Sequence, residues 1–480
     1  MKKLFTMIGC MLFLTMTAWS AEVGSGGVYS VIEISFTGPN QTPSDAPAKN
    51  IDFWVQFRHE SGSPTYKIYG FWDGDGNGGT SGNVFKVRFC PTQTGKWTLV
   101  DVYSNNSLLN NQKEGDYVTA TASSNKGFWI ADPNSEGSRW FMRSDGSHQY
   151  IVGNTHYNFL GAPNGHETNS TEIRTDIDEN AKCFNKIRFK STPSGDQVKP
   201  FFDASGNQTN DETDRPNPRF FTERVDAAVK RGFEKDVICD LILGGGDQKL
   251  TSEAYLKYMV ARYGSYPNVW FCLNNEWNEV STADYEKSWG EKLAALKAYP
   301  NPVSTHGTRG WDSKLNGSWC THSIRQGKLP SHLPDMHDCA DAIVTDYNAI
   351  GKNKPGINDE NGYDPNESTE EDVLEGITGS FAGGGYGSTG HKTGDKKGAY
   401  MWGYTSQGWT ISVHPSADNL GWMKNIINAN ITFWKMKPVK PASGNFFANA
   451  NSNFRGLEWT GQQYVLISDA SQSNITVTLP

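Results

Sequence analysis

Residues 269–277 read VWFCLNNEW, an apolar run that ends in two asparagines and a glutamate. A short run of this composition is typical of a strand buried on both faces, so Glu276 is expected where that strand ends. A second stretch, GINDE at residues 356–360, places Glu360 at the end of another β-prone run. Two acidic side chains at strand ends raise the question of whether they face one another across a cleft.

The chain around these stretches alternates between strand-like and helical patterns from about residue 131 to 440. Strands are predicted at 148–153, 184–189, 237–243, 269–273, 302–306, 342–347, 355–359 and 398–403. Helices are predicted at 218–231, 253–263, 285–298 and 370–379. Eight strands with intervening helices over about 300 residues predict a (β/α)8 barrel. An open doubly wound sheet is the alternative, and the count of eight favours closure.

One Gly-rich stretch formally matches a dinucleotide-binding fingerprint. Gly385, Gly387 and Gly390 have the G-x-G-x-x-G spacing, but a helical pattern precedes them where the fingerprint needs a strand. We therefore predict a loop before the eighth strand at this place.

Both flanks of the barrel region have β character. Residues 22–130 contain period-two strands at 31–36, 51–57, 84–89 and 97–103, separated by Gly, Pro, Asn and Ser clusters, which predicts an N-terminal β-sandwich. Residues 441–480 are expected to form a short C-terminal β segment, for which an incomplete β-sandwich is one interpretation. Within it, strands at 463–468 and 474–479 are expected to pair as a hairpin.

The N-terminus and the charge balance bound the location and the partners. Residues 1–21 combine two lysines, a short apolar run and small residues before Ala21, which predicts a signal peptide and a secreted or periplasmic protein. No other stretch has the roughly 20 apolar residues of a membrane span. The net charge of −8 argues against nucleic acid as a partner. Cys320 and Cys339 can form a disulfide in an exported chain. The sequence does not indicate the oligomeric state.

The strand count puts the two glutamates on opposite sides of one barrel mouth. Glu276 ends the fourth strand and Glu360 the seventh, and active sites of such barrels lie at the C-terminal ends of the strands. Two carboxyl groups across a cleft are the equipment for glycosidic bond cleavage. Glu279 and Asp359 are rivals, but the first lies past the strand end and the second points to the opposite side of its strand.

In these residues the chain resembles the clan A retaining glycoside hydrolases. The resemblance implies that Glu276 is the acid/base, Glu360 the nucleophile and Asn275 a ligand of the sugar 2-hydroxyl. It also implies that Arg188 holds the nucleophile, that Tyr347 ends the sixth strand as its partner, and that Trp402 in the eighth strand lies under the sugar. His156 and Tyr157 after the first strand, and His306 after the fifth, are further candidates for the cleft.

The resemblance extends to exported bacterial proteins that join such a barrel to an N-terminal domain of unknown function. Its motifs here are FWDG at 71–74, VRFCP at 87–91, TGKW at 94–97 and RSDG at 143–146. In relatives a collagen-binding-like domain follows the barrel, and GQQYV at 461–465 is similar to its start.

The resulting hypothesis is an exported retaining glycoside hydrolase that cleaves a polysaccharide or oligosaccharide with two glutamates. It requires no metal and no organic cofactor. The alternative is a non-catalytic glycan-binding or adhesion protein on the same scaffold. A polysaccharide lyase is a third possibility, which would need a Tyr, His or Lys base at the cleft.

Overall fold

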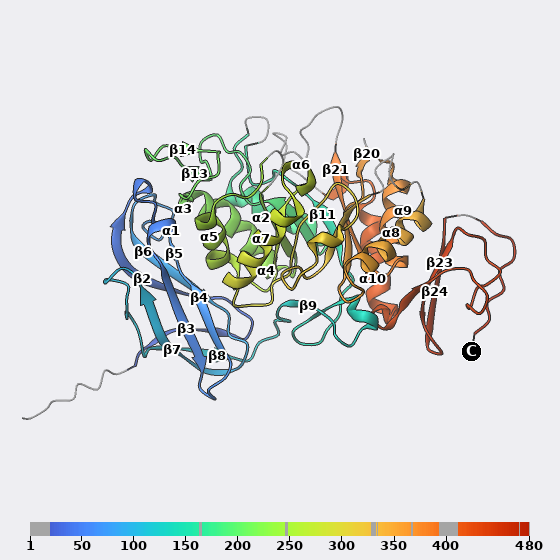
Figure 1. The fold of residues 1–480 in the computed structure, drawn as a ribbon, viewed down its shortest axis with the longest axis horizontal. Coiled ribbons are helices and arrows are strands. Elements are labelled where there is room, and N and C mark those ends of the chain that lie inside the picture. Colours follow the sequence, from blue (N-terminus) through green and yellow to red (C-terminus); the bar gives the residue numbers. More distant parts are fainter. Residues whose placement is uncertain are drawn as a thin grey trace, which may run out of the picture.

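The computed structural model describes residues 20–162, 166–244, 248–327, 333, 335–365, 368–392, 411–469 and 471–479. A β-sandwich and a small C-terminal sheet lie at opposite ends of the long axis, with a barrel between them (Figure 1). Residues 1–19 of the predicted signal peptide, the strand predicted at 398–403 and Trp402 lie outside the described residues.

The N-terminal part is a β-sandwich, as its alternating sequence predicts. One sheet has the order β1 (Glu22–Gly27), β8 (Tyr117–Thr121), β7 (Gly95–Ser104), β3 (Phe53–His59) and β4 (Thr65–Tyr69). The other has the order β2 (Ile32–Gln41), β6 (Gly82–Phe89) and β5 (Phe71–Trp72). Alternate residues of β2 and β3 face inward, and Phe36, Val55, Phe85 and Leu99 are among the buried residues between the sheets.

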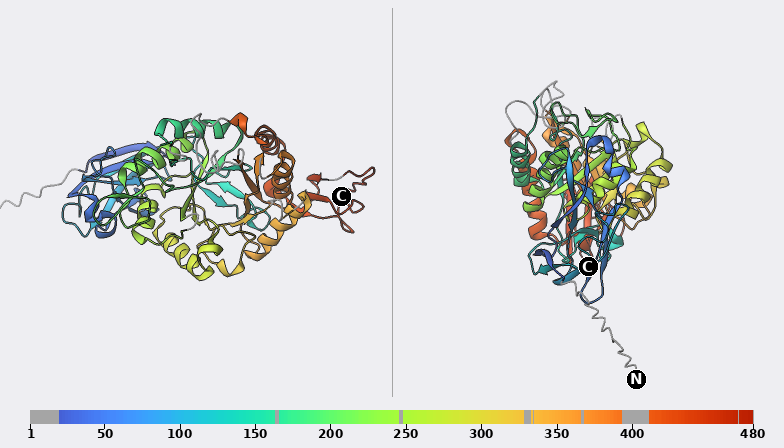
Figure 2. Two further views of the ribbon diagram at one scale, coloured as in Figure 1. Left: turned by 90° about the horizontal axis from the view of Figure 1, so that it is seen from above. Right: turned by 90° about the vertical axis from the view of Figure 1, so that its left-hand side faces the viewer.

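The central part is a nearly closed parallel barrel of eight strands, which confirms the predicted fold class. Its strands are β11 (Val152–Thr155), β12 (Lys186–Lys190), β15 (Ile238–Gly244), β16 (Val269–Asn274), β17 (Val303–Ser304), β18 (Ser323–Gln326), β19 (Gly356–Glu360) and β21 (Tyr386–Lys392). The first strand, β11, pairs in parallel with the eighth, β21, which an open doubly wound sheet would not do. Figure 2 (left) shows the helices as a ring around the strands.

The fifth and sixth strands of the barrel, β17 and β18, are not paired by a regular ladder of backbone hydrogen bonds. The two are joined instead by a hydrogen bond from the Thr321 amide to the Val303 carbonyl at 2.8 Å and one from Ser304 Oγ to the His322 carbonyl at 2.7 Å. The connection between β17 and β18 contains a single turn of 3-10 helix, Ser313–Leu315, and no α-helix, and all of its residues are described. The other connections carry the outer helices.

The outer helices follow the strands in chain order. They are α2 (Ser170–Cys183), α3 (Pro218–Phe220) continuing through a π-helical turn into α4 (Asp226–Glu234), α5 (Glu253–Tyr263), α6 (Trp277–Val280), α7 (Ala283–Leu296), α8 (Met336–Ala349), α9 (Glu370–Ala382) and α10 (Ala417–Asn430). Among the described residues, no helix combines the length and the apolar character needed to cross a membrane.

A two-stranded hairpin fills the N-terminal end of the barrel. It consists of β9 (Trp129–Ala131) and β10 (Phe141–Arg143), and its Trp129 and Phe141 rings lie 6.3 and 4.8 Å from the ring of Trp270 in the fourth strand. This end is therefore packed with aromatic side chains, and the opposite, C-terminal end of the strands is left for a site.

Charged side chains join the sandwich to the barrel. Arg88 of β6 contacts Asp226 of α4 at 2.5 Å, and Arg262 of α5 contacts both Asp226 and, at 2.6 Å, Asp73 beyond β5. All four side chains are buried. Since a buried charge is costly without its partner, this network fixes how the two parts dock.

Three sequence expectations are wrong. Residues 342–347 lie inside helix α8, and the sixth strand is β18. The predicted loop at 385–390 belongs to the eighth strand, β21. In the C-terminal sheet of β22 (Lys437–Val439), β23 (Phe454–Trp459) and β24 (Gln463–Ser468), the strand at 463–468 pairs with β23 and not with residues 474–479.

Candidate active site

Glu276 lies at the end of the fourth strand, where the chain turns abruptly into α6. Its backbone is left-handed, with φ 48° and ψ 46°, a conformation that costs energy in a residue other than glycine. Asn274 anchors the turn, because its amide nitrogen donates to Glu286 Oε1 at 2.6 Å and its side-chain oxygen accepts from the Leu250 amide. The Glu276 carboxyl, half-buried, accepts from Gln326 Nε2 at 3.2 Å.

Glu360 ends the seventh strand and is buried. The hydroxyl of Tyr157, after the first strand, donates to Glu360 Oε2 at 2.7 Å. The same hydroxyl accepts from Arg188 Nη1 at 3.0 Å, and Arg188 Nη2 donates to Asn275 Oδ1 at 2.8 Å. Arg188 therefore reaches Glu360 through Tyr157, and its positive charge favours the ionised carboxylate.

His306 connects the two glutamates. Its Nδ1 accepts the backbone N–H of Glu276 at 3.3 Å, which leaves the ring proton on Nε2. Nε2 lies 3.3 Å from Glu360 Oε2. Burial lowers the pKa of His306 well below its usual value, so the ring that lies against the Glu360 carboxylate is neutral.

Burial raises the pKa of both glutamates, but their surroundings differ. For Glu360 the charge of Arg188 and the hydroxyls of Tyr363 and Tyr157 oppose that rise in pKa. For Glu276 the largest opposing effect is that of the neutral Gln326 amide, the charges of Arg188 and Lys190 add less, and the nearby Glu279 raises the pKa further. Glu360 is thus the better supported as an anion and Glu276 as an acid.

Asp359, the alternative to Glu360, has its carboxylate bound to other side chains inside the barrel. Its Oδ1 lies 2.5 Å from Lys186 Nζ and accepts from Ser388 Oγ at 2.6 Å. Lys186 also contacts Asp240 at 2.8 Å, and all three charged side chains are fully buried. The charges of Lys186 and Arg188 overcome burial and hold the pKa of Asp359 below its ordinary value.

Replacing Lys186 with Met is expected to lower the free energy of unfolding by about 3–5 kcal/mol, because two buried carboxylates lose their cation. Urea denaturation followed by circular dichroism measures the change. The matched control is Lys182→Met, since Lys182 pairs with Glu179 on the surface and its loss should cost less than about 1 kcal/mol. Equal effects of the two substitutions would contradict a special role for Lys186.

Most of the predicted site residues come together at the C-terminal end of the barrel. Asn275 and Arg188 are hydrogen-bonded to the group that holds Glu360, and His306 accepts from the Glu276 backbone and lies 3.3 Å from Glu360. His156 is buried with its ring stacked on Phe159, and it lies beside His391 and His414. 

Tyr347 lies elsewhere, because the strand that was expected to carry it is a helix. Its hydroxyl lies 3.1 and 2.7 Å from the carbonyl oxygens of Gly137 and Lys352, to which it donates, and the Arg139 guanidinium covers its ring. It supports the connection around β10 and not the glutamates.

Tyr157, a candidate for the cleft in the sequence, donates to Glu360, whereas two other groups that act on the glutamates come from residues without a role in the sequence prediction of the site. One is Tyr363, which comes three residues after Glu360, so its closeness to a strand end was the available signal. Gln326 ends β18, the strand that the sequence placed some twenty residues too late.

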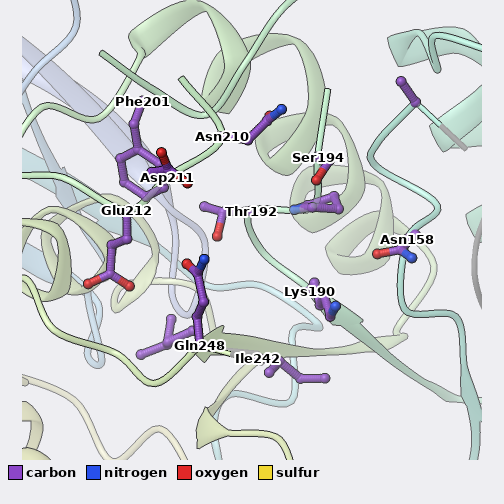
Figure 3. Close-up of a pocket in the computed structure, with 14 residues that line it drawn as sticks. Asn158, Lys190, Thr192, Ser194, Phe201, Asn210, Asp211, Glu212, Ile242 and Gln248 are labelled. Atoms are coloured by element: carbon purple, nitrogen blue, oxygen red, sulfur yellow. The ribbon is translucent and has the colours of Figure 1, made fainter. Parts of the chain in front are cut away.

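A polar cavity of about 350 Å³ lies beside the glutamates, at the ends of the second and third strands. Figure 3 shows Asn158, Lys190, Thr192, Glu212 and Gln248 around it. Lys190 also acts on the charge of Glu276, which links the cavity to the carboxyl pair. A hollow lined with amides, hydroxyls and charges suits a ligand that carries many hydroxyl groups.

Cys320 and Cys339 are both buried, and the disulfide considered for them is not formed in the structure. Cys320 lies near β18, and its Sγ contacts the Gly317 carbonyl at 3.3 Å. Cys339 lies in α8.

Comparison with known proteins supports this architecture. Residues 26–102 match a domain of unknown function, DUF5060. A Bacteroides vulgatus protein provisionally described as a glycoside hydrolase has 22% sequence identity and a TM-score of 0.69, over 92% of this chain and 84% of that one. A glycoside hydrolase family 5 protein of the same species has 15% identity and a TM-score of 0.51, over 69% and 80%. No curated protein matches the sequence.

Proposed function

We propose that this protein is a retaining glycoside hydrolase in which Glu360 is the nucleophile and Glu276 the acid/base. The observation that carries the proposal is the group formed by the two glutamates, in which neutral His306 contacts the backbone of one and the carboxylate of the other. The names of proteins that share the fold point to the same class of reaction.

In the first step a Glu360 oxygen attacks the anomeric carbon while the bond from that carbon to the leaving oxygen breaks. The Glu276 proton moves to the leaving oxygen, so that the leaving sugar departs as a neutral alcohol. In the second step Glu276 takes a proton from water, the water oxygen attacks the anomeric carbon, and Glu360 is released as a carboxylate.

The residues around Glu360 suit a nucleophile. Arg188 and Tyr157 favour its anion, the Tyr157 hydroxyl fixes the orientation of the carboxylate, and the His306 ring lies 3.3 Å from it. None of these three groups carries a proton that Glu360 would take at neutral pH, since Tyr157 has a raised pKa and the His306 ring is neutral. Asn275 is held by Arg188, with its amide nitrogen left for a sugar hydroxyl.

The cavity beside the glutamates supports a polysaccharide or oligosaccharide substrate. It lies at the ends of the second and third strands, and Gly244 in its wall accepts from the amide of Asn275, the residue before Glu276, at 3.1 Å, so a sugar bound there would lie next to the acid/base. The predicted signal peptide adds the proposal that the enzyme acts outside the cytoplasm, on glycans that the cell meets there.

The test begins with a screen of aryl glycosides and of plant and algal polysaccharides for release of reducing ends. The substrate found is then followed by proton NMR, and the first product is expected to keep the anomeric configuration of the substrate. A first product of inverted configuration would contradict the double displacement. Binding of polysaccharide without any hydrolysis would favour the glycan-binding alternative, and an unsaturated product would identify a lyase.

A further inference from the structure

A second cluster of reactive side chains lies near the seventh and eighth strands, apart from the carboxyl pair. It contains Asp364 of β20 (Tyr363–Pro365), His391 of β21 and His414, which precedes α10. One ligand atom from each of the three lies within 4.8 Å of the others, and all three residues are buried. Asp364 and His391 are directly opposite one another in the parallel ladder of β20 and β21.

Hydrogen bonding within the cluster leaves atoms for a further partner. Asp364 Oδ2 accepts from the Ser416 amide at 2.9 Å, which fixes the carboxylate and leaves Oδ1 toward His414. Oδ1 lies 3.0 Å from His414 Nδ1, which is also 3.4 Å from Ser416 Oγ. Among the described residues, His414 Nε2 has no hydrogen-bond partner although the side chain is fully buried. A buried polar atom without a partner calls for an explanation, and a ligand is one.

The donor set selects the kind of ligand. Two imidazoles and one carboxylate match the preferences of Zn²⁺, whereas Ca²⁺ and Mg²⁺ prefer oxygen atoms alone. The Ser416 amide on the second oxygen of Asp364 is the kind of outer contact that orients a metal-binding carboxylate. A third imidazole, that of His156, lies close enough for the charges of His391 and His414 to act on it.

We propose that Asp364, His391 and His414 form a structural Zn²⁺ site. The ion would join the extended segment after Glu360 to the eighth strand and to the start of α10, three parts of the chain that are far apart in sequence. Tyr363, next to Asp364, contributes to the surroundings of Glu360, so the ion would also stabilise one wall of the carboxyl pair. Cleavage of the glycosidic bond makes no use of it.

The experiment uses the whole mature chain without a histidine tag. The protein is stripped with a chelator, dialysed against Zn²⁺ alone, and analysed for bound metal by mass spectrometry and for its thermal midpoint. We expect one equivalent of Zn²⁺ per chain and a midpoint at least about 5 °C above that of the stripped protein. Less than a tenth of an equivalent in the unchanged protein, or no shift of the midpoint, would overturn the proposal.

Variants locate the ion. His414→Ala and Asp364→Asn, which lie on different segments, should each weaken Zn²⁺ binding more than about 100-fold, since loss of an outer contact alone costs about 10–100-fold. The control is His337→Ala, because Asp335, His337 and Asp338 form the other metal-compatible group among the described residues, and it is partly exposed. Retention of Zn²⁺ by the first two variants, or its loss in the control, would contradict the assignment.

A spectroscopic measurement keeps the test informative if a variant does not fold. Co²⁺ added to the stripped, unchanged protein is expected to give the intense visible bands of a four-coordinate ion with nitrogen and oxygen ligands, and Zn²⁺ should abolish them. Weak bands typical of hydrated, six-coordinate Co²⁺ would contradict a buried site of this composition.

Discussion

Glu360→Gln is expected to lower kcat by at least about 10⁴-fold while the protein stays folded. The amide cannot attack the anomeric carbon, so the covalent intermediate does not form. Gln keeps the size of Glu and can still accept from Tyr157, so the packing at this buried position is preserved. Steady-state kinetics on the best aryl glycoside, together with a thermal unfolding curve, measures both expectations.

Azide separates loss of the nucleophile from general damage. In Glu360→Ala the space left by the side chain admits azide to the face of the sugar that the carboxylate attacked. The product is then a glycosyl azide with the configuration opposite to that of the substrate. The matched control is Glu371→Gln, a substitution on the exposed side of α9, which should leave kcat unchanged. Full activity of Glu360→Gln would exclude the proposed role.

The strands that the sequence predicts well are those whose apolar runs are long. The third and fourth strands, β15 and β16, consist of six or seven buried residues each, and such runs stand out in any window. The order of the elements followed from them, and so did the placement of Glu276 and Glu360 at the ends of the fourth and seventh strands.

The prediction of the sixth strand failed for a physical reason. Helix α8 contains Ile343, Val344 and Thr345 in a row, and β-branched residues favour strands when neighbours are ignored. The true strand, β18, has only four residues, SIRQ, with a charged residue among them. Arg325 is acceptable there because it pairs with Asp346 of α8 at 2.6 Å, a contact that no local pattern contains.

The prediction of the eighth strand failed because close packing against neighbouring side chains requires glycine at several of its positions. A side chain at Gly387 would come within 2.6 Å of Ile377 in α9, and one at Gly390 within 2.5 Å of the Tyr363 ring. Glycine therefore fits these positions, although it weakens the strand pattern. The same failure hid the cluster of Asp364, His391 and His414, since His391 appeared to lie in a loop.

The sequence predicts which residues lie at the strand ends of the site. It does not predict the hydrogen bonds between their side chains. His306 and Asn275 directly follow strands, so counting strands brought them near the glutamates. The path from Arg188 through the Tyr157 hydroxyl to Glu360 depends on the lengths and directions of three side chains from three segments. Sequence periodicity carries no such information.

Glu276→Ala is expected to slow hydrolysis by an amount that depends on the leaving group. Natural glycosides and other poor leaving groups need the proton from Glu276, so their kcat/KM should fall by about 10²–10⁴-fold. Aryl glycosides whose phenol is already acidic leave without that proton, so their first step should change little. For these substrates the slow step becomes release of the sugar from Glu360, and azide should speed it, giving a glycosyl azide of retained configuration.

The pH profile gives an independent measure of the same group. Glu276 acts as an acid only while protonated, and burial raises its pKa, so activity of the unchanged enzyme persists above the ordinary range of a glutamate and falls as pH rises through that pKa. Glu276→Ala removes this alkaline fall for activated substrates. Glu279→Gln is the control: Glu279 is exposed and raises the pKa of Glu276, so its loss should keep the fall and move it to lower pH. If the alkaline fall survived in Glu276→Ala, another residue would have to be the acid. A leaving-group dependence without a change of pH profile would mean that Glu276 positions the acid and does not supply the proton.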